Sequence, residues 1–351
     1  MERPSGTYNV NYSQDMAIVR TRTQWGLLIA GLITLFALPC FASSYWLSFI
    51  NIAAITLIAV LGLNILTGYC GQISLGQAAF MGVGAYTSAF LCNYWGLSFW
   101  TAFPCAVLAT GLVGIIFGLP ALRLKGFYLT MSTLAAQFLL VWCFGHIKPD
   151  ILGGLVGISL PYPSIGDFIF DSEQSMFYII VSLAVVMTFF AKNLVRTRVG
   201  RAFIAIRDND LAAEVMGINP FYYKLLAFFI CSLYAGVAGS LWGHYVRFID
   251  PEHFTLMDSI WYMGIAIVGG LGSTAGAVFG TIFMRGLDLI VTRISPVLSA
   301  IFPEIAGSMF AALSQMFFGL VIILFLIFES RGLAHRWEVF KASYRIYPYP
   351  Y

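Results

Sequence analysis

Residues 45–66 read YWLSFINIAAITLIAVLGLNIL, and they lie inside a longer run, residues 23–122, that contains no Asp, Glu, Lys, Arg or His. A transmembrane helix needs about 20 apolar residues, so this run has room for roughly four crossings. Over the whole chain of 351 residues, 60% are hydrophobic and only 10% are charged, whereas about a quarter are charged in an average soluble domain. The sequence therefore predicts an all-α polytopic membrane protein.

Nine apolar segments are candidates for membrane spans. They are residues 25–41, 45–66, 77–95, 100–119, 127–145, 175–191, 225–243, 260–283 and 309–328. The first 24 residues are polar and a long apolar run follows them, which argues against a cleaved signal peptide. We expect residues 1–24 to form a cytoplasmic N-terminal segment, residues 25–328 a transmembrane domain, and residues 329–351 a cytoplasmic tail.

The charged residues predict which side of the membrane each loop faces. Basic residues cluster at 20–22, 123–125, 192–207 and 331–345, and loops of this kind stay in the cytoplasm. Loops 146–174 and 245–259 are mainly acidic, which suits the outer side. Both termini are then cytoplasmic, whereas nine uninterrupted spans would leave the C-terminus outside. One segment must be broken, and we predict about ten transmembrane helices.

The segment 260–291 is the candidate for the broken span. Its sequence GGLGSTAG, residues 269–276, interrupts the apolar run with backbone that does not easily stay helical. We predict two short half-spans around it. Arg285 and Asp288 lie three apart on the second, where they can face each other and lower the cost of charge near the membrane.

A second glycine-rich break, GYCGQISLGQAAFMGVGAY, occupies residues 68–86. Placing residue 74 over residue 273 aligns glycine, alanine and phenylalanine at 71/270, 78/277 and 80/279, which indicates a weak internal repeat, parallel or inverted. Broken helices in corresponding halves point to a transport path. We predict that the path is lined by Gln72, Ser74, Gln77, Phe80 and Ser273. The alternative is that small residues only permit close helix packing.

The stretch RTRVGRAFIAIRDNDLAAEVMGINPFYYK, residues 196–224, is a polar, basic interruption of the spans. Residues 208–210 are good N-cap types, whereas Gly217 suits a left-handed C-cap and Pro220 forbids continuation. The pattern predicts one short helix from about residue 210 to Gly217. Such a helix is marginal alone, so we expect a partner, in this chain or another, for its apolar residues Leu211, Val215 and Met216. The alternative is an ordinary solvated loop.

Other motifs are missing from the sequence. The six cysteines form no Cys-x-x-Cys pair and the four histidines lack ligand spacing, so we expect neither disulfides nor a metal site. No lysine follows a glycine, which excludes the end of a phosphate-binding loop. We therefore expect a transport subunit with no catalytic residues and no cofactor, in contact with membrane lipid and not with nucleic acid, whose energy comes from another chain.

A secondary transporter driven by an ion gradient is the alternative function. Such a transporter would prefer intramembrane carboxylates as proton relays or ion ligands. The predicted spans offer only Asp288 and Glu304, and Arg285 and Arg293 lie near enough to neutralise Asp288.

Three blocks of sequence carry a resemblance to a known family. They are GQISLGQAAFMGVGAY (71–86) with GLPALRLKGFYLT (118–130), VGRAFIAIRDNDLAAEVMGINPFYYKLLAF (199–228) with AGVAGSLW (235–242), and DPEHFTLMDSIWYMGIAIVGGLGSTAGAVFG (250–280). Together they resemble the permease subunits of high-affinity branched-chain amino-acid ABC importers, the LivM/LivH family, and LivM more closely than LivH.

The resemblance implies a permease subunit in the inner membrane of a bacterium. Its partners would be a LivH-like second permease, two LivG/LivF-like ATPases that hold ATP and Mg, and a periplasmic or lipid-anchored solute-binding protein. Loop 192–224 would couple the permease to the ATPases, through Arg207, Asp208, Asp210, Ala213, Glu214 and Gly217. The family's EAA-like motif is degenerate at these positions. The family implies a branched-chain or other neutral amino acid as the default cargo. Members of the family differ in cargo, and their selectivity lies largely in the separate binding protein.

Overall fold

The computed structural model describes residues 22–121, 127–301, 306–329 and 331–346. The predicted N-terminal segment up to residue 21, the basic residues Arg123 and Lys125, and Glu304 lie outside this part of the chain. The helices are α2 (Arg22–Ala37), α3 (Ser44–Leu63), α4 (Gln77–Tyr94), α5 (Phe99–Ala121), α6 (Phe127–His146), α7 (Pro149–Leu152), α8 (Glu173–Arg196), α9 (Arg198–Asp208), α10 (Asp210–Val215), α11 (Pro220–Val246), α12 (Leu256–Gly269), α13 (Thr274–Ile301), α14 (Ala306–Phe328) and α15 (Gly332–Ile346).

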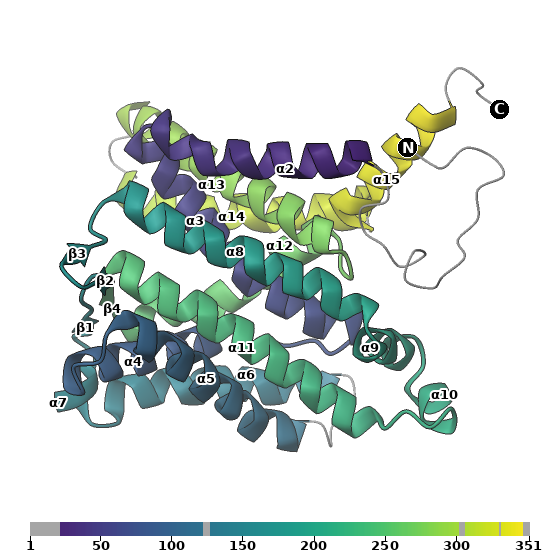
Figure 1. Ribbon diagram of the computed structural model, residues 1–351, viewed down its shortest axis with the longest axis horizontal. Helices are drawn as coiled ribbons and strands as arrows, with labels where there is room; N and C mark the ends of the chain where they lie inside the picture. Colours follow the sequence, from purple (N-terminus) through teal and green to yellow (C-terminus); the bar gives the residue numbers. More distant parts are fainter. Residues whose placement is uncertain (1–21, 122–126, 302–305, 330, 347–351) are drawn as a thin grey trace.

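Short elements join these helices. A π-helix (Asn64–Tyr69) continues α3, and 3₁₀ helices occupy Leu38–Cys40 and Pro251–Phe254. Strand β1 (Ile158–Ser159) pairs antiparallel with β4 (Phe248–Ile249), and β2 (Ser164–Ile165) pairs with β3 (Phe168–Ile169). Figure 1 shows the long helices side by side, with the strands at one end of the bundle and α9 and α10 at the other.

Six helices in the described part are long and apolar enough to cross a membrane. They are Ser44–Tyr69, Phe99–Pro120, Tyr128–His146, Glu173–Arg196, Pro220–Val246 and Thr274–Arg293. A seventh span results if Gln315–Phe328 and Gly332–Ser343, which meet at 44°, are one bent crossing. The expectation of an all-helical polytopic membrane protein is confirmed, while the total of ten spans and the side of the termini remain predictions.

The prediction of two short half-spans around residues 269–276 is wrong for the second half. α12 has 14 residues and, at about 1.5 Å per residue, is about 21 Å long, so it is short. α13 has 28 residues. The glycines end only α12: Gly270 has φ +112° and Gly272 has φ +77°. From Thr274 onward the backbone is free to stay helical, so α13 reaches the length of a full span.

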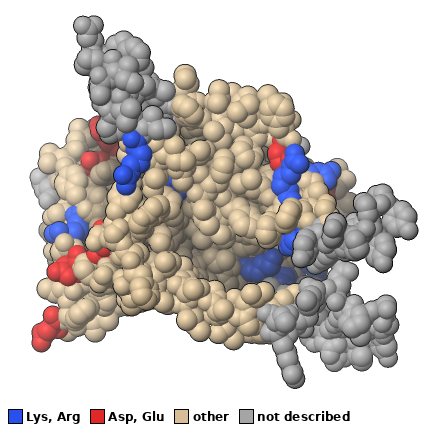
Figure 2. Space-filling model, turned by 90° about the horizontal axis from the view of Figure 1, so that it is seen from above, with Lys and Arg blue, Asp and Glu red and all other residues tan. Residues whose placement is uncertain are grey.

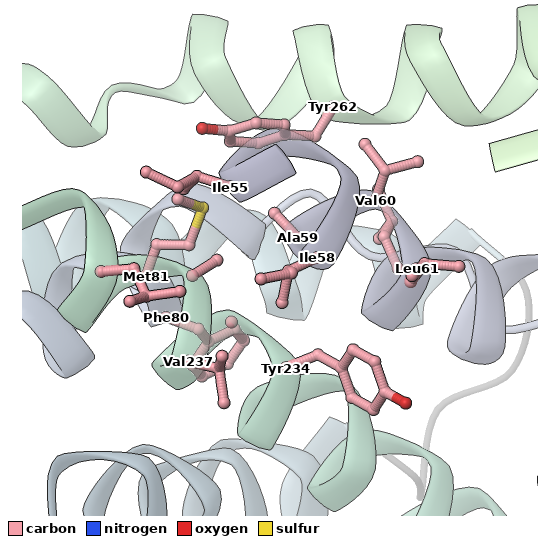
Figure 3. Packing of buried hydrophobic residues seen from close by; sticks show 14 of the residues in the cluster. Ile55, Ile58, Ala59, Val60, Leu61, Phe80, Met81, Tyr234, Val237 and Tyr262 are labelled. Atoms are coloured by element: carbon pink, nitrogen blue, oxygen red, sulfur yellow. The ribbon is translucent and has the colours of Figure 1, made fainter. Parts of the chain in front are cut away.

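The core lies where α3, α4, α11 and α12 meet (Figure 3). Ile58 and Ala59 of α3 are fully buried, and Phe80 and Val237 pack beside them. Helices α4 and α11 approach very closely, since a Cβ added at Gly84 would lie 2.7 Å from the Gly236 Cα. Small residues therefore bring the first glycine-rich break and α11 together, as close helix packing in membranes requires.

The charged residues gather at the two ends of the bundle. In Figure 2 most of the visible Asp and Glu side chains lie at one end and most of the Lys and Arg side chains at the other. The basic end carries α9 and α10, and the strands lie at the opposite end. This distribution agrees with the loop charges read from the sequence, and the visible surface between the two ends carries few charged side chains.

The C-terminal helix α15 packs against the second glycine-rich break. Ala334 is buried, and a Cβ on Gly332 would lie 2.5 Å from the Gly270 Cα. The ring of Trp337 lies 5.9 Å from the ring of Phe279 on α13. Residues 332–346 are thus a docked helix within the predicted tail.

Candidate coupling segment and translocation path

The short helix predicted in the coupling loop is present as α10. The side chain of Asn209 accepts hydrogen bonds from the backbone N–H groups of Leu211 and Ala212, each at 3.1 Å. These bonds satisfy two of the free donors of the first turn, so Asn209 is the N-cap. Among the three candidates at 208–210, only the structure shows which one caps the helix.

The end of α10 is a Schellman motif. The N–H of Ile218 donates to the carbonyl of Ala213 at 3.0 Å, and the N–H of Gly217 donates to the carbonyl of Glu214 at 2.9 Å. This pair of bonds needs a left-handed residue, and Gly217 has φ +84°. Two residues later Asn219 caps α11 by accepting from Tyr222 N–H at 3.2 Å. The short helix is therefore stopped and redirected within four residues.

The large apolar side chains of α10 have little contact with this chain. Leu211 is 63% exposed, Val215 87% and Met216 81%, whereas Ala213 on the other face is 4% exposed. The carboxylate of Asp210 lies 3.6 Å from the ammonium of Lys224 on α11. The helix is thus fixed to the bundle on one face and presents an unpartnered apolar face on the other, together with the exposed Glu214.

A second helix in the loop, α9, was missed by the sequence analysis, which expected only one. Its buried residues are Gly200, Ala202, Phe203 and Ile206, at helical spacing, and Thr197 accepts from Gly200 N–H at 3.4 Å. The apolar residues at i, i+3 and i+4 among arginines are the signal that could have revealed it.

Arg207, at the end of α9, contacts the first glycine-rich break. Its Nη1 donates to the carbonyl of Gly68 at 3.0 Å, and its Nη2 donates to Asp208 at 3.0 Å. A Cβ on Gly71 would lie 2.9 Å from the Arg207 Cγ. The coupling segment therefore lies directly against the backbone of that break.

The two glycine-rich breaks meet in space, and Asn64 joins them. Its Nδ2 donates to the Ser273 carbonyl at 3.0 Å, and its Oδ1 accepts from the Gly272 N–H at 2.8 Å. A Cβ on Gly68 would lie 2.3 Å from the Gly272 nitrogen, so only glycine fits there. The π-helix Asn64–Tyr69 thus replaces the missing helical partners of the second break, as backbone inside a membrane protein requires.

The predicted path residues fall into two groups. Gln72 is half-buried and lines a cavity of about 580 Å³ beside Arg207, Asp210 and Lys224, at the basic end of the bundle. Ser273 is half-buried, and its hydroxyl accepts from Gly276 N–H at 3.1 Å.

The other three predicted path residues are buried. Ser74 is 1% exposed and Phe80 2%, and the Gln77 amide is fully enclosed. Gln77 Nε2 donates to the Ala59 carbonyl at 2.8 Å. Of the five residues, Gln72 lines the cavity at the basic end, and the lining role of all five remains a prediction.

A buried polar cluster at the start of α4 was also missed. The N–H groups of Ala78 and Ala79 donate to Ser259 Oγ at 2.9 Å and Gln137 Oε1 at 3.0 Å. Ser259 also donates to Gln137 at 2.9 Å. These side chains cap a helix that begins inside the bundle. A glutamine within the apolar segment 127–145 was the available signal.

The described residues contain no group of three or more His, Cys, Asp or Glu that could hold a metal ion. All six cysteines are free. Within the described chain, this end of the bundle carries a capped helix, an exposed apolar face and basic side chains around it.

The comparisons with known proteins agree with this architecture. The model of the family described as "Branched-chain amino acid transport system / permease component" matches residues 45–326. The chain belongs to this family and is a permease component of an ABC importer.

Within the family the chain is of the LivM type. It is 32% identical over 337 residues to the high-affinity branched-chain amino acid transport system permease protein LivM of Escherichia coli, covering 87% of this chain and 74% of that protein. LivM of Salmonella typhimurium is also 32% identical, over 81% of this chain and 69% of its own length. The autoinducer 2 import system permease protein LsrC of Salmonella typhi is 26% identical, over 54% of this chain and 56% of its own length.

Proposed function

We propose that the chain is one of two permease subunits of an ABC importer in the cytoplasmic membrane of a bacterium. It passes a branched-chain or other neutral amino acid, delivered by an external binding protein, into the cytoplasm. The other partners are a LivH-like permease and two LivG/LivF-like ATPases that bind ATP and Mg. The names of the LivM relatives support this cargo, and membership of the permease family supports ABC transporter partners in general.

The exposed face of α10 is the observation that carries the proposal. Leu211 and Val215 project from a helix of six residues, and Met216 from its C-cap, at the basic end of the bundle. Water does not favour so many large apolar groups on so small a helix, whereas a partner's groove would bury them. The helix is held rigidly by the Asn209 cap, the Schellman motif at Gly217 and the ion pair between Asp210 and Lys224. It can therefore transmit a movement of the partner as a lever.

The decisive experiment reconstitutes the permease pair, the ATPases and the binding protein in liposomes. We expect uptake of L-leucine that requires ATP inside. Val215→Asp should lower ATP-driven uptake at least about tenfold, because a charge enters a buried apolar contact. Val156→Asp is the matched control, since Val156 is exposed to a similar degree, 83%, in the loop before β1.

The ion-gradient alternative is tested in the same system. This chain alone, in liposomes with a proton or sodium gradient and without ATPases, should not accumulate any solute. Accumulation under those conditions would exclude the proposed function, and so would uptake by the full complex that does not depend on ATP.

A further inference from the structure

A cavity of about 240 Å³ lies between α4, α11, the 3₁₀ helix Pro251–Phe254, α12 and α13. One water occupies about 30 Å³ in the liquid, so the cavity has room for several waters or one small solute. Its walls combine large apolar and aromatic side chains with charged ones, among them Trp242, Met257, Asp258, Trp261, Arg285 and Asp288. It is separate from the cavity beside Gln72 at the basic end.

Arg285 is a charge inside an apolar helix. It lies on the part of α13, Thr274–Arg293, that is long and apolar enough to be a span, and its side chain is 16% exposed. Its Nε and Nη2 donate to the Thr56 hydroxyl at 3.0 and 2.7 Å, and its guanidinium lies 4.2 Å from the Trp261 ring. A buried charge at such a place is costly and usually serves function.

The predicted pairing of Arg285 with Asp288 is present but loose. The Nη1 atom of Arg285 lies 3.6 Å from a carboxylate oxygen of Asp288, and that carboxylate is 46% exposed. Bidentate Arg–carboxylate pairs are closer, at about 2.7–2.9 Å. Arg285 also lines the cavity, so its loosely paired Nη1 has capacity for a second anionic partner.

The negative charges of the cavity lie near the start of α12 and on α13. Thr255 donates to one oxygen of Asp258 through its N–H at 3.0 Å and its hydroxyl at 2.5 Å, which fixes that carboxylate in a capping box. His253 also lines the cavity, and its Nδ1 lies 3.3 Å from Asp250. The cavity thus presents one guanidinium, two carboxylates and one imidazole, with aromatic walls between them.

We propose that this cavity is a transient binding site for a neutral amino acid in its zwitterionic form. Arg285 binds the carboxylate of the solute, Asp258 and Asp288 bind its ammonium group, and Trp242, Trp261 and Met257 contact its apolar side chain. The ammonium group of the solute balances the carboxylate in excess of Arg285, and its carboxylate gives the guanidinium a second partner beside Asp288, which lies 3.6 Å away, so a solute with one charge makes only one of these two contacts. The inference rests on the proposed function and extends it by placing a selective site within the permease.

The test uses a Met257→Cys variant in the full complex. Met257 is 46% exposed, so the new thiol can be reached by a small polar reagent, and labelling at position 257 is measured by peptide mass spectrometry. We expect saturating L-leucine to slow labelling at least about fivefold. The single-charge analogues 3-methylbutylamine and 4-methylpentanoate, at the same concentration, should have no effect. Val156→Cys is the control, and its labelling rate should be the same with and without each of the three compounds.

A second variant set tests the charges. Arg285→Gln in the Met257→Cys background should raise the leucine concentration for half-protection at least about tenfold, since it removes a charge-assisted hydrogen bond. Arg293→Gln is the matched control on the same helix, because its guanidinium instead lies 4.6 Å from the Tyr45 ring. If Arg285→Gln fails to assemble, the proposed site is still tested by whether leucine, and not the amine or the acid, slows labelling of Met257→Cys.

The outcomes separate this site from the proposed function. If the complex imports leucine with ATP but leucine never protects position 257, in the ATP-free or the vanadate-trapped state, the site is wrong and the function stands. Equal protection by the amine or the acid would overturn the zwitterion assignment. If no neutral amino acid is imported with ATP, the function itself fails.

Discussion

Gly217 shows how one residue decides the geometry of the coupling segment. Its φ of +84° is open to glycine and strained for other residues, and no heavy atom lies within 4 Å of an added Cβ. The constraint there is therefore conformational and not steric. Strain at such a position costs about 1–3 kcal/mol, which is enough to shift a helix of fewer than two turns without unfolding the membrane bundle.

We predict that Gly217→Pro leaves the protein inserted but uncouples ATP hydrolysis from uptake in the reconstituted complex. Proline locks φ near −65° and removes the N–H that binds Glu214. Glu214→Lys should do the same by reversing the charge on the exposed face. Gly217→Ala and Gly166→Ala form a matched pair. Both glycines have positive φ and open space around an added Cβ, but Gly166 lies outside the loop 192–224. Unchanged coupling in both Gly217→Pro and Glu214→Lys would contradict the docking role.

Ser74 is the residue whose predicted lining role is the most open to test. It is 1% exposed in this conformation. We predict that Ser74→Cys reacts with a small polar thiol reagent in at least one state of the transport cycle. Ser88→Cys, a buried position on α4, should stay inert in every state. Persistent inertness at position 74 would mean that the path lies elsewhere.

The neighbouring Cys70 is a poor nucleophile in this conformation. It is buried, and burial raises the pKa of its thiol to about 12, with the nearby Lys224 acting in the opposite direction. The folded pKa lies above the ordinary value, so the thiolate is scarce at neutral pH and forms only near pH 12. Reaction at Cys70 should therefore be slow below that range.

At the scale of elements, the two glycine-rich breaks and α9 form one connected unit. Arg207 of α9 binds the carbonyl of Gly68, and Asn64 binds the backbone of Gly272 and Ser273. A displacement of the coupling segment therefore reaches both breaks through three hydrogen bonds. Rigid helices joined at such contacts move as bodies, which is how hinge and shear motions spread.

We predict that Asn64→Ala lowers the unfolding free energy by about 1–3 kcal/mol, because Gly272 N–H and Ser273 C=O lose their partner away from water. Thermal unfolding of the purified permease in detergent measures this. Asn93→Ala is the control: its amide donates to the Ser159 carbonyl at an exposed site, so the change should be within about 0.5 kcal/mol. Equal effects of the two substitutions would show that Asn64 does not hold the breaks together.

At the scale of the whole molecule, the separation of charge between the two ends predicts orientation. The end that carries α9, α10 and α15 is rich in arginine and lysine, and such ends face the cytoplasm. We predict that a reporter fused after Tyr351 is cytoplasmic, with a reporter in the loop before β1, at Val156, as the external control. A periplasmic signal at the C-terminus would restore the count of nine uninterrupted spans.

Much of the architecture could be predicted from the sequence. The uncharged run before residue 123 predicted a membrane protein. The residues around α10 predicted where this helix lies, since caps and glycine stops act within a few residues. The length of α13 was predicted wrongly, because a glycine-rich stretch shows that a helix ends and not how far the next one extends. α9 was missed because its apolar positions are few among arginines.

The sequence by itself determined that the chain is a helical membrane protein and that a short helix lies between about residue 210 and Gly217. Both follow from local properties: transfer of apolar segments out of water, and capping by neighbouring residues. Only the tertiary structure decided that Asn64 joins the two breaks, that Arg207 reaches Gly68, and that Arg285 and Asp258 line one cavity. These contacts join residues far apart in the chain, and hydropathy and spacing carry no information about which distant partners meet.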